Sequence, residues 1–380
     1  MIKVAYITDA TGLGGGETSL LNHLIVCRET SGLHPILICP QGSLEHRARA
    51  LGITTRVLVL ESFGCTSLTG LWKFLRSVER LIRIARLESV SYLHTESAKA
   101  CCLAVVASKI LSIPLFHTYH GYWDVRRSIV NFVVRRAIKR TFVVSRHLLP
   151  EAKRVFGSEK TQWLPLGLNK AFITPCTQSA NGIRLQFGLP DKAKIILQLA
   201  RYQRVKGQGR LLSAFEIGKQ RGQFKDAILV FVGDVIDGSD HTSHEYYNEV
   251  YNRAKSSQWS SQIYFLPFQC DPQIVLSLAD VVVVPSDYES FGMVVVEAMA
   301  MRKPVVATGY GGPAEIIRDG LDGLLFNPDD IQALIGCIAK VLEDVNFRSG
   351  LASEAYRKAW ELYAPTARAN ELLKHYCEAI

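Results

Sequence analysis

The sequence predicts an α/β protein with two domains, each built on a doubly wound parallel sheet. The chain has 380 residues, which is too long for one comfortable hydrophobic core and suits two. Short apolar segments of strand character alternate with helical patterns along both halves, and this alternation indicates parallel strands joined by helices. A loop-rich segment with two prolines, Gly167–Pro190, lies between the halves and is the expected interdomain linker.

The first half begins with a strand, a glycine-containing loop and a helix, expected at Lys3–Thr8, Thr11–Glu17 and Thr18–Arg28. Further strands, with helical patterns between them, are expected at His34–Pro40, Arg56–Leu60, Ser91–His94, Leu115–Tyr119 and Thr141–Ser145. Parallel doubly wound sheets bind ligands at the carboxyl ends of their strands. Polar residues that follow these strands are therefore the first candidates for a functional site.

The second half repeats the alternation, and we expect its strands at Lys194–Ala200, Ala227–Val232, Gln262–Leu266, Val281–Val284, Pro304–Ala307 and Gly323–Phe326. The segment Leu351–Ile380 has a helical pattern that Pro365 should kink or break. We therefore place the domains at residues 1–170 and 171–360, followed by a C-terminal helical segment at residues 361–380.

Composition narrows the class of protein. The hydrophobic fraction of 48% and the charged fraction of 21% are those of an ordinary globular protein. No apolar run is long enough to span a membrane, and the N-terminus reads as a strand rather than a signal peptide. The nine cysteines show no C-x-x-C spacing, which suits a reducing cytosol better than a disulfide framework or a zinc site. We expect a cytoplasmic protein, and no metal-binding pattern is evident.

The net charge of +9 is concentrated in the first half, since Met1–Lys170 contains 23 Lys and Arg against 11 Asp and Glu. In Leu71–Leu87, one helical face is expected to carry the apolar residues Leu71, Leu75, Val78, Ile82 and Ala85, with Lys73, Arg76, Arg80 and Arg83 nearly opposite. Arg126–Arg140 adds six cations and no acid, with like-charge pairs four residues apart, Arg135/Lys139 and Arg136/Arg140. This surface is either a solvated basic face or a contact for an anionic membrane surface or a phosphate-bearing acceptor. We find no nucleic-acid-binding motif and do not expect nucleic acid as a partner.

The strongest functional signal lies in Asp280–Met301, which reads as a buried strand, a turn, a loop with Glu289 and a helix that starts at about Gly292. The free backbone N–H groups of the helix start, predicted to be those of Ser290, Phe291, Gly292 and Met293, attract phosphate. Glu289 lies just ahead of the predicted helix and Glu297 two turns into it on the same side, and both carboxylates can accept hydrogen bonds from hydroxyls. A phosphate site between two hydroxyl acceptors fits a nucleotide sugar.

Two cations, Arg201 and Lys206, follow the first strand of the second half in the segment LARYQRVKGQ. Cations at the carboxyl end of a strand can hold a diphosphate and stabilise the charge that develops as it leaves. The alternative is solvated surface charge, which describes most Lys and Arg residues. Arg204 is a weaker candidate.

Two motifs in the first half add to this pattern. Gly14, Gly15 and Gly16 follow the first strand, where glycine lets backbone N–H groups approach a phosphate closely. They do not form a dinucleotide fingerprint, because Glu17 occupies the third glycine position and no acid ends the second strand. His120 follows the strand Leu115–Tyr119 and can hydrogen-bond a sugar hydroxyl or a phosphate, whereas we expect His117 to be structural.

Glu289 and Glu297, the intervening SFGMVVV and the later Gly311–Ile317 block resemble the E-x7-E region of the retaining family 4 glycosyltransferases, the glycosyl transferases group 1. The resemblance extends over nearly the whole chain and is strongest from Lys194 to Pro328. It implies the GT-B fold, with two Rossmann-like domains that face a central cleft and a C-terminal helix that packs back on the N-terminal domain. It also implies metal-independent, retaining transfer of a hexose-type sugar from a nucleoside-diphosphate sugar, with the departing phosphate as the base.

The resemblance implies roles for the residues singled out above. Arg201, Lys206 and the N–H groups of Ser290–Met293 would hold the diphosphate, Glu297 the ribose hydroxyls and Glu289 the sugar hydroxyls. His120 and the Gly14–Gly16 loop would contact the sugar. The base would meet backbone atoms of the segment that ends at Phe268, and Gly233 is a further donor-binding candidate. The family usually has G-x-G where this chain has GDVIDG from Gly233, which leaves the shape of that loop uncertain.

The acceptor that we expect is a glycan or a lipid-linked molecule, in cell-surface polysaccharide or glycolipid synthesis. The basic first half suggests that the protein could lie peripherally at the cytoplasmic face of a membrane. Two alternatives remain at this point: a nucleotide-sugar epimerase of the same fold, and a non-catalytic protein that binds anions or membranes. The near-complete set of cleft residues argues against the second alternative.

Overall fold

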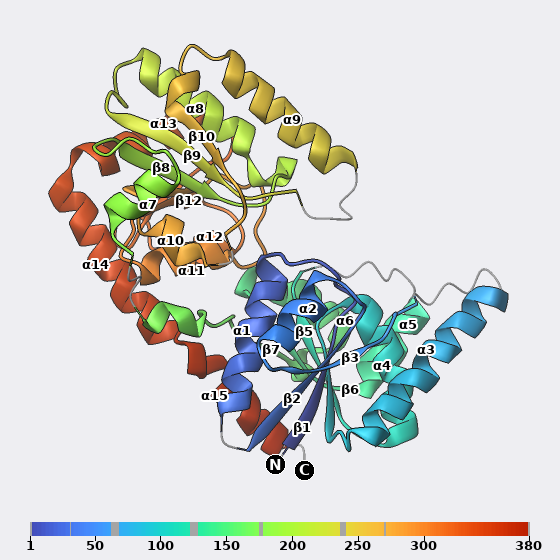
Figure 1. Cartoon of the computed structure of the whole chain (residues 1–380). Helices are drawn as coiled ribbons and strands as arrows, with labels where there is room; N and C mark the ends of the chain where they lie inside the picture. Colours follow the sequence, from blue (N-terminus) through green and yellow to red (C-terminus); the bar gives the residue numbers. More distant parts are fainter. Residues whose placement is uncertain are drawn as a thin grey trace. The chain divides into compact units, whose positions relative to one another are not determined.

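The computed structural model describes residues 2–30, 32–61, 68–121, 128–174, 178–235, 241–269 and 271–378. The chain divides into two compact units (Figure 1). Unit 1 comprises Met1–Gly167 with Pro365–Ile380, and unit 2 comprises Leu168–Ala364. Each unit contains one parallel sheet with helices on its faces, so the predicted α/β class with two doubly wound sheets is confirmed.

The sheet of unit 1 has the strand order β3-β2-β1-β4-β5-β6-β7. Its strands are β1 (Ile2–Ile7), β2 (Leu33–Cys39), β3 (Thr54–Val57), β4 (Tyr92–Thr95), β5 (Leu115–Tyr119), β6 (Ile138–Val143) and β7 (Thr161–Trp163). The first six match predicted strands to within a few residues. The edge strand β7 was not predicted, because it has three residues and its side chains are only half-buried. The strand order changes direction between β1 and β4, which is where such sheets bind ligands.

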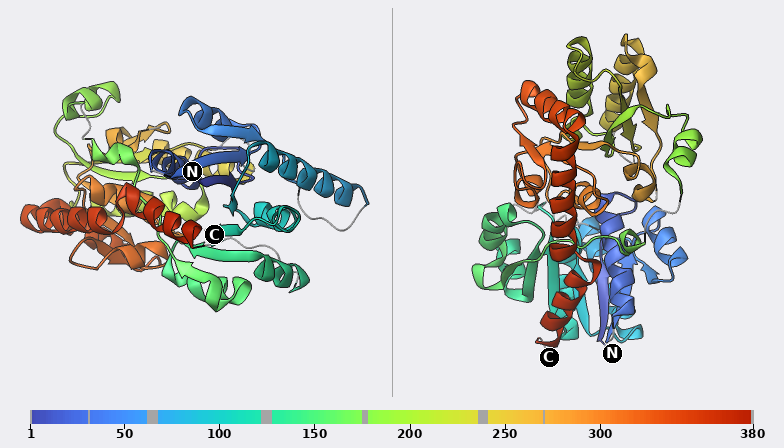
Figure 2. Two further views of the ribbon diagram at one scale, coloured as in Figure 1. Left: turned by 90° about the horizontal axis from the view of Figure 1, so that it is seen from below. Right: turned by 90° about the vertical axis from the view of Figure 1, so that its left-hand side faces the viewer.

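Helices cover both faces of this sheet. They are α1 (Gly15–Glu29), α2 (Ser43–Ala50), α3 (Leu68–Leu87), α4 (Ala98–Leu111), α5 (Ser128–Ala137), α6 (Leu149–Phe156) and α15 (Pro365–Cys377). Right-handed crossovers place α1 on one side of the sheet and α3 and α4 on the other. The left view of Figure 2 shows this arrangement, with α15 beside α1.

The sheet of unit 2 has the order β10-β9-β8-β11-β12-β13. Its strands are β8 (Lys194–Leu199), β9 (Ala227–Val232), β10 (Ile263–Leu266), β11 (Val281–Val284), β12 (Val305–Thr308) and β13 (Leu324–Phe326). Its helices are α7 (Ala180–Gln186), α8 (Gln208–Gln220), α9 (His241–Ser256), α10 (Pro272–Leu276), α11 (Met293–Ala300), α12 (Gly312–Ile316), α13 (Ile331–Glu343) and α14 (Val345–Leu362). The four valines of β11 are all buried, as expected for a central parallel strand that is covered on both faces.

Short 3-10 helices complete the chain at η1 (Arg146–Leu148), η2 (Ser158–Lys160), η3 (Lys170–Ile173), η4 (Arg204–Lys206) and η5 (Ser260–Gln262). Most of the predicted linker Gly167–Pro190 belongs to unit 2, where it includes η3 and α7. The predicted break at Pro365 is confirmed, because α14 ends at Leu362 and Pro365 is the first residue of α15. No helix in the described part of the chain is long and apolar enough to cross a bilayer.

The predicted buried face of α3 is wrong in its first two turns. Leu71 and Leu75 are exposed, whereas Phe74, Val78 and Leu81 are buried. Both sets have helical spacing, so periodicity alone does not separate them. The set that contains the large Phe74 side chain faces the core, and Leu71 and Leu75 are rotated toward solvent.

The predicted like-charge pairs in the next basic segment are also wrong. Helix α5 ends at Ala137, so Lys139 and Arg140 lie on strand β6 and not one helical turn after Arg135 and Arg136. Arg140 donates from Nη1 to Gln162 Oε1 on β7, at 2.9 Å. Arg126 and Arg127, which were part of this expectation, lie outside the described residues.

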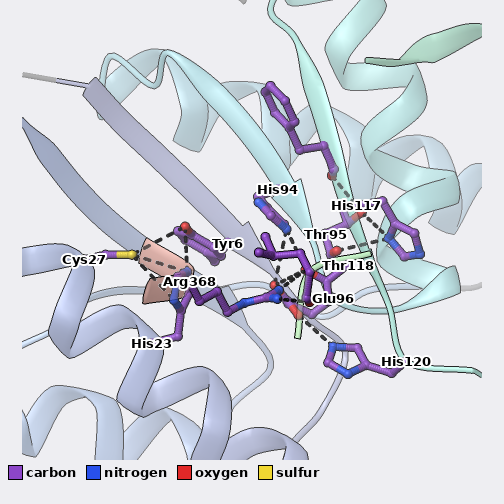
Figure 3. A network of polar contacts seen from close by, with 12 residues as sticks. Tyr6, His23, Cys27, His94, Thr95, Glu96, His117, Thr118, His120 and Arg368 are labelled. Atoms are coloured by element: carbon purple, nitrogen blue, oxygen red, sulfur yellow. Dashed lines mark hydrogen bonds and ion pairs between the residues drawn. The ribbon is translucent and has the colours of Figure 1, made fainter. Parts of the chain in front are cut away.

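A buried polar network attaches α15 to the sheet of unit 1 (Figure 3). The Arg368 guanidinium is buried and donates to the backbone oxygens of Leu164 (2.8 Å) and Pro165 (3.2 Å) and to Thr118 Oγ1 (3.0 Å). Burial lowers the pKa of Arg368, and the nearby carboxylate of Glu96 acts in the opposite direction. The buried cation is thus compensated by several acceptors, as a charge in an apolar interior must be.

A second branch of this network joins both ends of the chain. The Tyr376 hydroxyl of α15 lies 2.5 Å from His94 Nδ1 and 3.1 Å from the Tyr6 hydroxyl of β1. Tyr92 donates its hydroxyl hydrogen to the backbone oxygen of Tyr376 at 2.8 Å. Helix α15 is therefore an integral part of unit 1.

Replacing Arg368 with Met should destabilise unit 1, because three acceptors inside the protein would lose a charged donor. We expect the free energy of unfolding to fall by about 3 kcal/mol or more in urea denaturation. Lys374→Met, an exposed change on the same helix, should cost less than about 1 kcal/mol. Equal effects of the two changes would contradict the role assigned to Arg368.

Candidate functional site

In unit 2 the candidate residues gather where the strand order changes direction, between β8 and β11. Arg201 and Lys206 follow β8, and Glu289 follows β11. The structure brings two of the three together, since Lys206 Nζ lies 2.7 Å from Glu289 Oε1. Both side chains are mostly buried, at 17% and 16% exposed.

The Glu289 carboxylate is fixed through one of its two oxygens. Ser286 donates its hydroxyl hydrogen to Oε1 at 2.8 Å, so Lys206 and Ser286 share this acceptor. Among the described residues, Oε2 has no hydrogen-bond partner. An oriented carboxylate with one available oxygen can accept hydrogen bonds from a ligand hydroxyl. The ammonium of Lys206 has three N–H donors and can contact Glu289 and a phosphate oxygen at the same time.

Backbone packing sets this geometry. Gly207, next to Lys206, is in the left-handed region with φ 70°, and a Cβ there would lie 2.1 Å from the carbonyl oxygen of Pro285. A Cβ on Gly312, the first residue of α12, would lie 2.0 Å from the Phe291 carbonyl oxygen. The loops after β8, β11 and β12 are therefore in backbone contact, and glycine is required at these positions.

The start of α11 agrees with the predicted start at about Gly292, but not all of the predicted first-turn donors belong to it. Gly292 caps the helix, and Met293 is its first residue. The N–H groups of Ser290 and Phe291 therefore do not belong to the first turn, and the Phe291 side chain is buried. The first-turn donors are those of Met293 and Val294, since Val295 donates its N–H to the Gly292 oxygen.

Glu297 lies one turn into α11, not two as predicted. Its side chain is only 8% exposed. Burial raises the pKa of Glu297 to about 7. Among the described residues, no cation or hydrogen-bond donor compensates this carboxylate. Buried carboxyl groups without protein partners are common where a ligand supplies the donors.

Other predicted residues of unit 2 lie at the carboxyl ends of neighbouring strands. Arg201 is exposed after β8, and it forms no ion pair within the described ranges. Phe268 is exposed after β10. Gly233 follows β9, and a Cβ there would lie 2.0 Å from the Ala200 oxygen, so its structural role is to let the segments after β8 and β9 approach each other. Arg204 points away to Glu249, at 2.5 Å.

In unit 1, the predicted glycine loop is shorter than expected, because Gly14 is the N-cap of α1 and Gly15 and Gly16 form its first two positions. Glu17 Oε2 accepts a hydrogen bond from the Gly14 N–H at 2.8 Å. Gly15 and Gly16 are exposed, and a Cβ on either would meet no atom within 4 Å. The packing of the protein therefore does not require glycine here. Close approach of a ligand to a helix N-terminus would require it.

His120 follows β5 and is held by an acidic residue that the sequence analysis missed (Figure 3). Its Nε2 lies 2.8 Å from Glu96 Oε2, and Glu96 follows the neighbouring strand β4. Thr118 donates to the other oxygen, Oε1, at 3.2 Å. Because the Glu96 carboxylate contacts Nε2 of His120, the other ring nitrogen, Nδ1, is directed away from Glu96. The His120 ring is partly exposed. The signal for Glu96 was its position directly after the carboxyl end of β4. The prediction had ended this strand one residue early, at His94, and so did not place Glu96 there.

His117 is buried, and Nδ1 lies 2.9 Å from Thr95 Oγ1 and 3.0 Å from the Thr95 oxygen. Burial, with a smaller contribution from His120, lowers the pKa of His117 to about 3. The imidazole is thus neutral inside the sheet. This placement fits the structural role that we expected for His117.

Two protein-family models match the chain. The model described as glycosyl transferases group 1 matches residues 181–358, and the model described as glycosyltransferase family 4 matches residues 13–196. Similar curated proteins include a D-inositol 3-phosphate glycosyltransferase of Salinispora arenicola, 27% identical over 300 residues, which are 72% of this chain and 66% of that protein. A sucrose synthase of Acidithiobacillus caldus is 32% identical over 197 residues, 46% of this chain and 24% of that protein. The chain thus matches between a quarter and two thirds of the length of these relatives.

Solved structures show the same fold. The Anabaena protein Alr3699/HepE in complex with UDP and glucose has a TM-score of 0.86, with 20% identity and full coverage of both chains. A glycosyltransferase from Rickettsia africae has a TM-score of 0.86 and 20% identity, and covers all of this chain and 98% of its own. These likenesses confirm the GT-B fold that the sequence predicted.

Glu297→Gln should make unit 2 more stable at high pH. The folded state binds the Glu297 proton more tightly than the unfolded state, so wild-type stability falls as the pH rises from the ordinary value of 4.5 to about 7. Gln does not ionise, and the variant should gain up to about 3 kcal/mol over wild type at about pH 8, with little gain below about pH 5. Urea denaturation at both pH values measures this difference. Glu343→Gln, an exposed change on α13, is the control. A gain independent of pH would contradict the assignment.

Proposed function

Because the chain belongs to the group 1 glycosyltransferases of the GT-B fold, we propose that it transfers a hexose-type sugar from a nucleoside-diphosphate sugar to an acceptor hydroxyl. The observation that carries this proposal is the Lys206–Glu289 pair, with Glu297 eight residues further on. It brings a cation from the loop after β8 to an oriented carboxylate in the loop after β11, and the helix that follows this second loop carries a buried carboxylate. Structural neighbours in complex with UDP and with UDP-glucose support a donor of this class.

The donor would bind mainly to unit 2. Lys206, Arg201 and the N–H groups of Met293 and Val294 would hold the diphosphate, because cations and a helix N-terminus both favour phosphate. Glu289 Oε2 would accept a hydrogen bond from a sugar hydroxyl. Glu297 would accept hydrogen bonds from the ribose hydroxyls, which would supply the donors that this buried carboxylate does not find in the protein.

We infer a retaining and metal-independent mechanism. The acceptor hydroxyl would attack from the face that the diphosphate leaves, with the departing phosphate as the base. The positive charge of Lys206 and Arg201 would stabilise the leaving diphosphate as its negative charge develops. Within the described ranges, no group of three or more His, Cys, Asp or Glu residues is placed to hold a metal ion.

In unit 1, His120 and the N-terminus of α1 would contact the transferred sugar. Glu96 would act as a positioning residue, because it holds the imidazole through Nε2 and so directs Nδ1. The acceptor would be a glycan or a lipid-linked molecule in cell-surface polysaccharide or glycolipid synthesis. A cytoplasmic location with peripheral contact to a membrane is the corresponding proposal.

Thermal-shift measurements with a panel of nucleoside diphosphates and their sugars test the donor site. One nucleotide should raise the melting temperature, with and without EDTA, and Glu297→Ala should remove the effect. No stabilisation by any nucleotide would overturn the proposal. Consumption of the nucleotide sugar in the absence of an acceptor would instead favour an epimerase of the same fold.

Glu289→Gln should reduce kcat for sugar transfer by about 100-fold or more, because the oriented acceptor oxygen becomes an amide group. Asp287→Asn is the matched control. It alters an acid in the same loop that pairs with Arg210 on the protein surface, and it should leave kcat within about twofold. Full activity of the Glu289 variant would exclude it from the catalytic site.

A double-mutant cycle tests whether Glu96 acts through His120. Glu96→Gln and His120→Ala should each lower kcat, by about 10-fold or more. The double variant should be no slower than His120→Ala alone, because the positioning residue has no effect once the ring is absent. Independent, additive losses would show that Glu96 acts in another way.

A further inference from the structure

The outer side of α3 carries an apolar patch that the core does not use. Leu68, Leu71, Trp72 and Leu75 are exposed, at 88%, 39%, 58% and 51%. Their spacing places them together on the first two turns of the helix, beside the buried face of Phe74 and Val78. Single exposed apolar residues are ordinary, but four in two turns make a patch of the kind that marks an interaction site.

Cations adjoin this patch on the same helix. Lys73, Arg76, Arg80 and Arg83 are exposed and lie on the far side of the apolar patch from the core. Arg76 stacks on the Trp72 ring, with its Cζ 5.0 Å from the ring centroid. Along its length α3 therefore presents a buried face, an exposed apolar patch and a cationic stripe.

The cations of the α3 stripe differ from several exposed arginines of unit 2. Within the described residues, none of the four cations of the α3 stripe forms an ion pair. In unit 2, exposed arginines such as Arg204, Arg318 and Arg357 pair with acids. On α3 a single acid, Glu79, stands against five Lys and Arg residues, so α3 projects a positive potential.

Helix α5 repeats the combination in the same helical layer. Phe132 and Val133 are exposed, and the Arg136 guanidinium stacks on Phe132 with its Cζ 5.1 Å from the ring centroid. Helix α4 contacts both α3 and α5, and Figure 1 shows the three helices side by side. Together α3, α4 and α5 contain nine Lys and Arg and a single acid, Glu79.

A cationic hollow of about 400 Å³ lies at the end of α5. Its lining includes Lys109, Arg136, Lys139 and Lys160. Burial lowers the pKa of Lys160, and neighbouring cations lower it further, against the opposing effect of Glu159. A phosphate group in this hollow would relieve the mutual repulsion of these cations.

We propose that this layer, through the apolar patch and cationic stripe of α3 and the exposed residues of α5, docks the protein on an anionic lipid bilayer. Apolar side chains with an indole beside Lys and Arg are the composition of helices that lie in a membrane interface. A nucleic acid would use the cations and leave the leucines in water. The docking would serve a lipid-linked acceptor and in that respect rests on the proposed function, but lipid binding itself does not require catalysis.

Co-sedimentation of the full chain with vesicles tests the proposal. The protein should bind phosphatidylcholine vesicles that contain phosphatidylglycerol, bind pure phosphatidylcholine much less, and dissociate as salt is added. Arg76→Gln combined with Arg83→Gln should weaken binding by about fivefold for each charge removed. Trp72→Ala and Leu75→Ser should weaken binding to anionic vesicles as well, and this loss should persist at high salt.

Controls on unit 2 carry equivalent changes. Leu321→Ser and Lys192→Gln alter an exposed leucine and an exposed lysine, and both should leave lipid binding unchanged. The proposal is overturned if the wild-type protein does not bind anionic vesicles at low salt, or if the α3 variants bind them as tightly as the wild type does. It is also overturned if those variants lose RNA binding without any change in lipid binding. Nucleotide thermal shifts on the same variants separate the two ideas: a normal shift with no lipid binding would reject the docking surface alone, and lipid binding with no shift by any nucleotide would reject the donor site alone.

Discussion

The candidate donor site depends on how closely the backbones of unit 2 approach one another. Lys206 can reach Glu289 because Gly207 lets the loop after β8 contact the carbonyl of Pro285. Gly312 does the same for the loop after β12, which contacts the Phe291 carbonyl. Any side chain at these glycines would clash with a carbonyl oxygen of the facing loop and force the loops apart. The position of the ion pair therefore depends on this steric constraint as well as on the attraction between the two charges.

The same principle explains why the site residues are far apart in sequence. In each unit the strand order changes direction at one point, and the loops on either side diverge there. In unit 2 this point lies between β8 and β11, which carry Lys206 and Glu289. In unit 1 it lies between β1 and β4, which lead to Gly14 and Glu96. Polar groups at these points contact one another or face solvent, and both arrangements leave hydrogen-bonding capacity for a ligand.

The sequence predicted the sheets well, because buried parallel strands such as Val281–Val284 are continuous apolar runs. It predicted Glu289 and Lys206 as site residues, and the structure shows that they pair. It did not predict Glu96, since a single acid after a short strand has no pattern of its own. It placed the start of α11 correctly at about Gly292 but counted Ser290 and Phe291 among the first-turn donors, because a left-handed glycine cap is a backbone feature that apolar periodicity does not register. On α3, two apolar stripes had equal periodicity, and only tertiary packing selects between them.

The position of α15 has a consequence for the candidate site of unit 1. A buried guanidinium is stable only when its donors are satisfied, and Arg368 finds its acceptors on segments that precede it by about 200 residues or more. One of these acceptors, Thr118, also donates to the Glu96 carboxylate that holds His120. The orientation of His120 thus depends on the docking of the last helix of the chain. The histidine of unit 1 can in this way be held in place only after α15, which follows Thr118 by about 250 residues, has docked on the sheet.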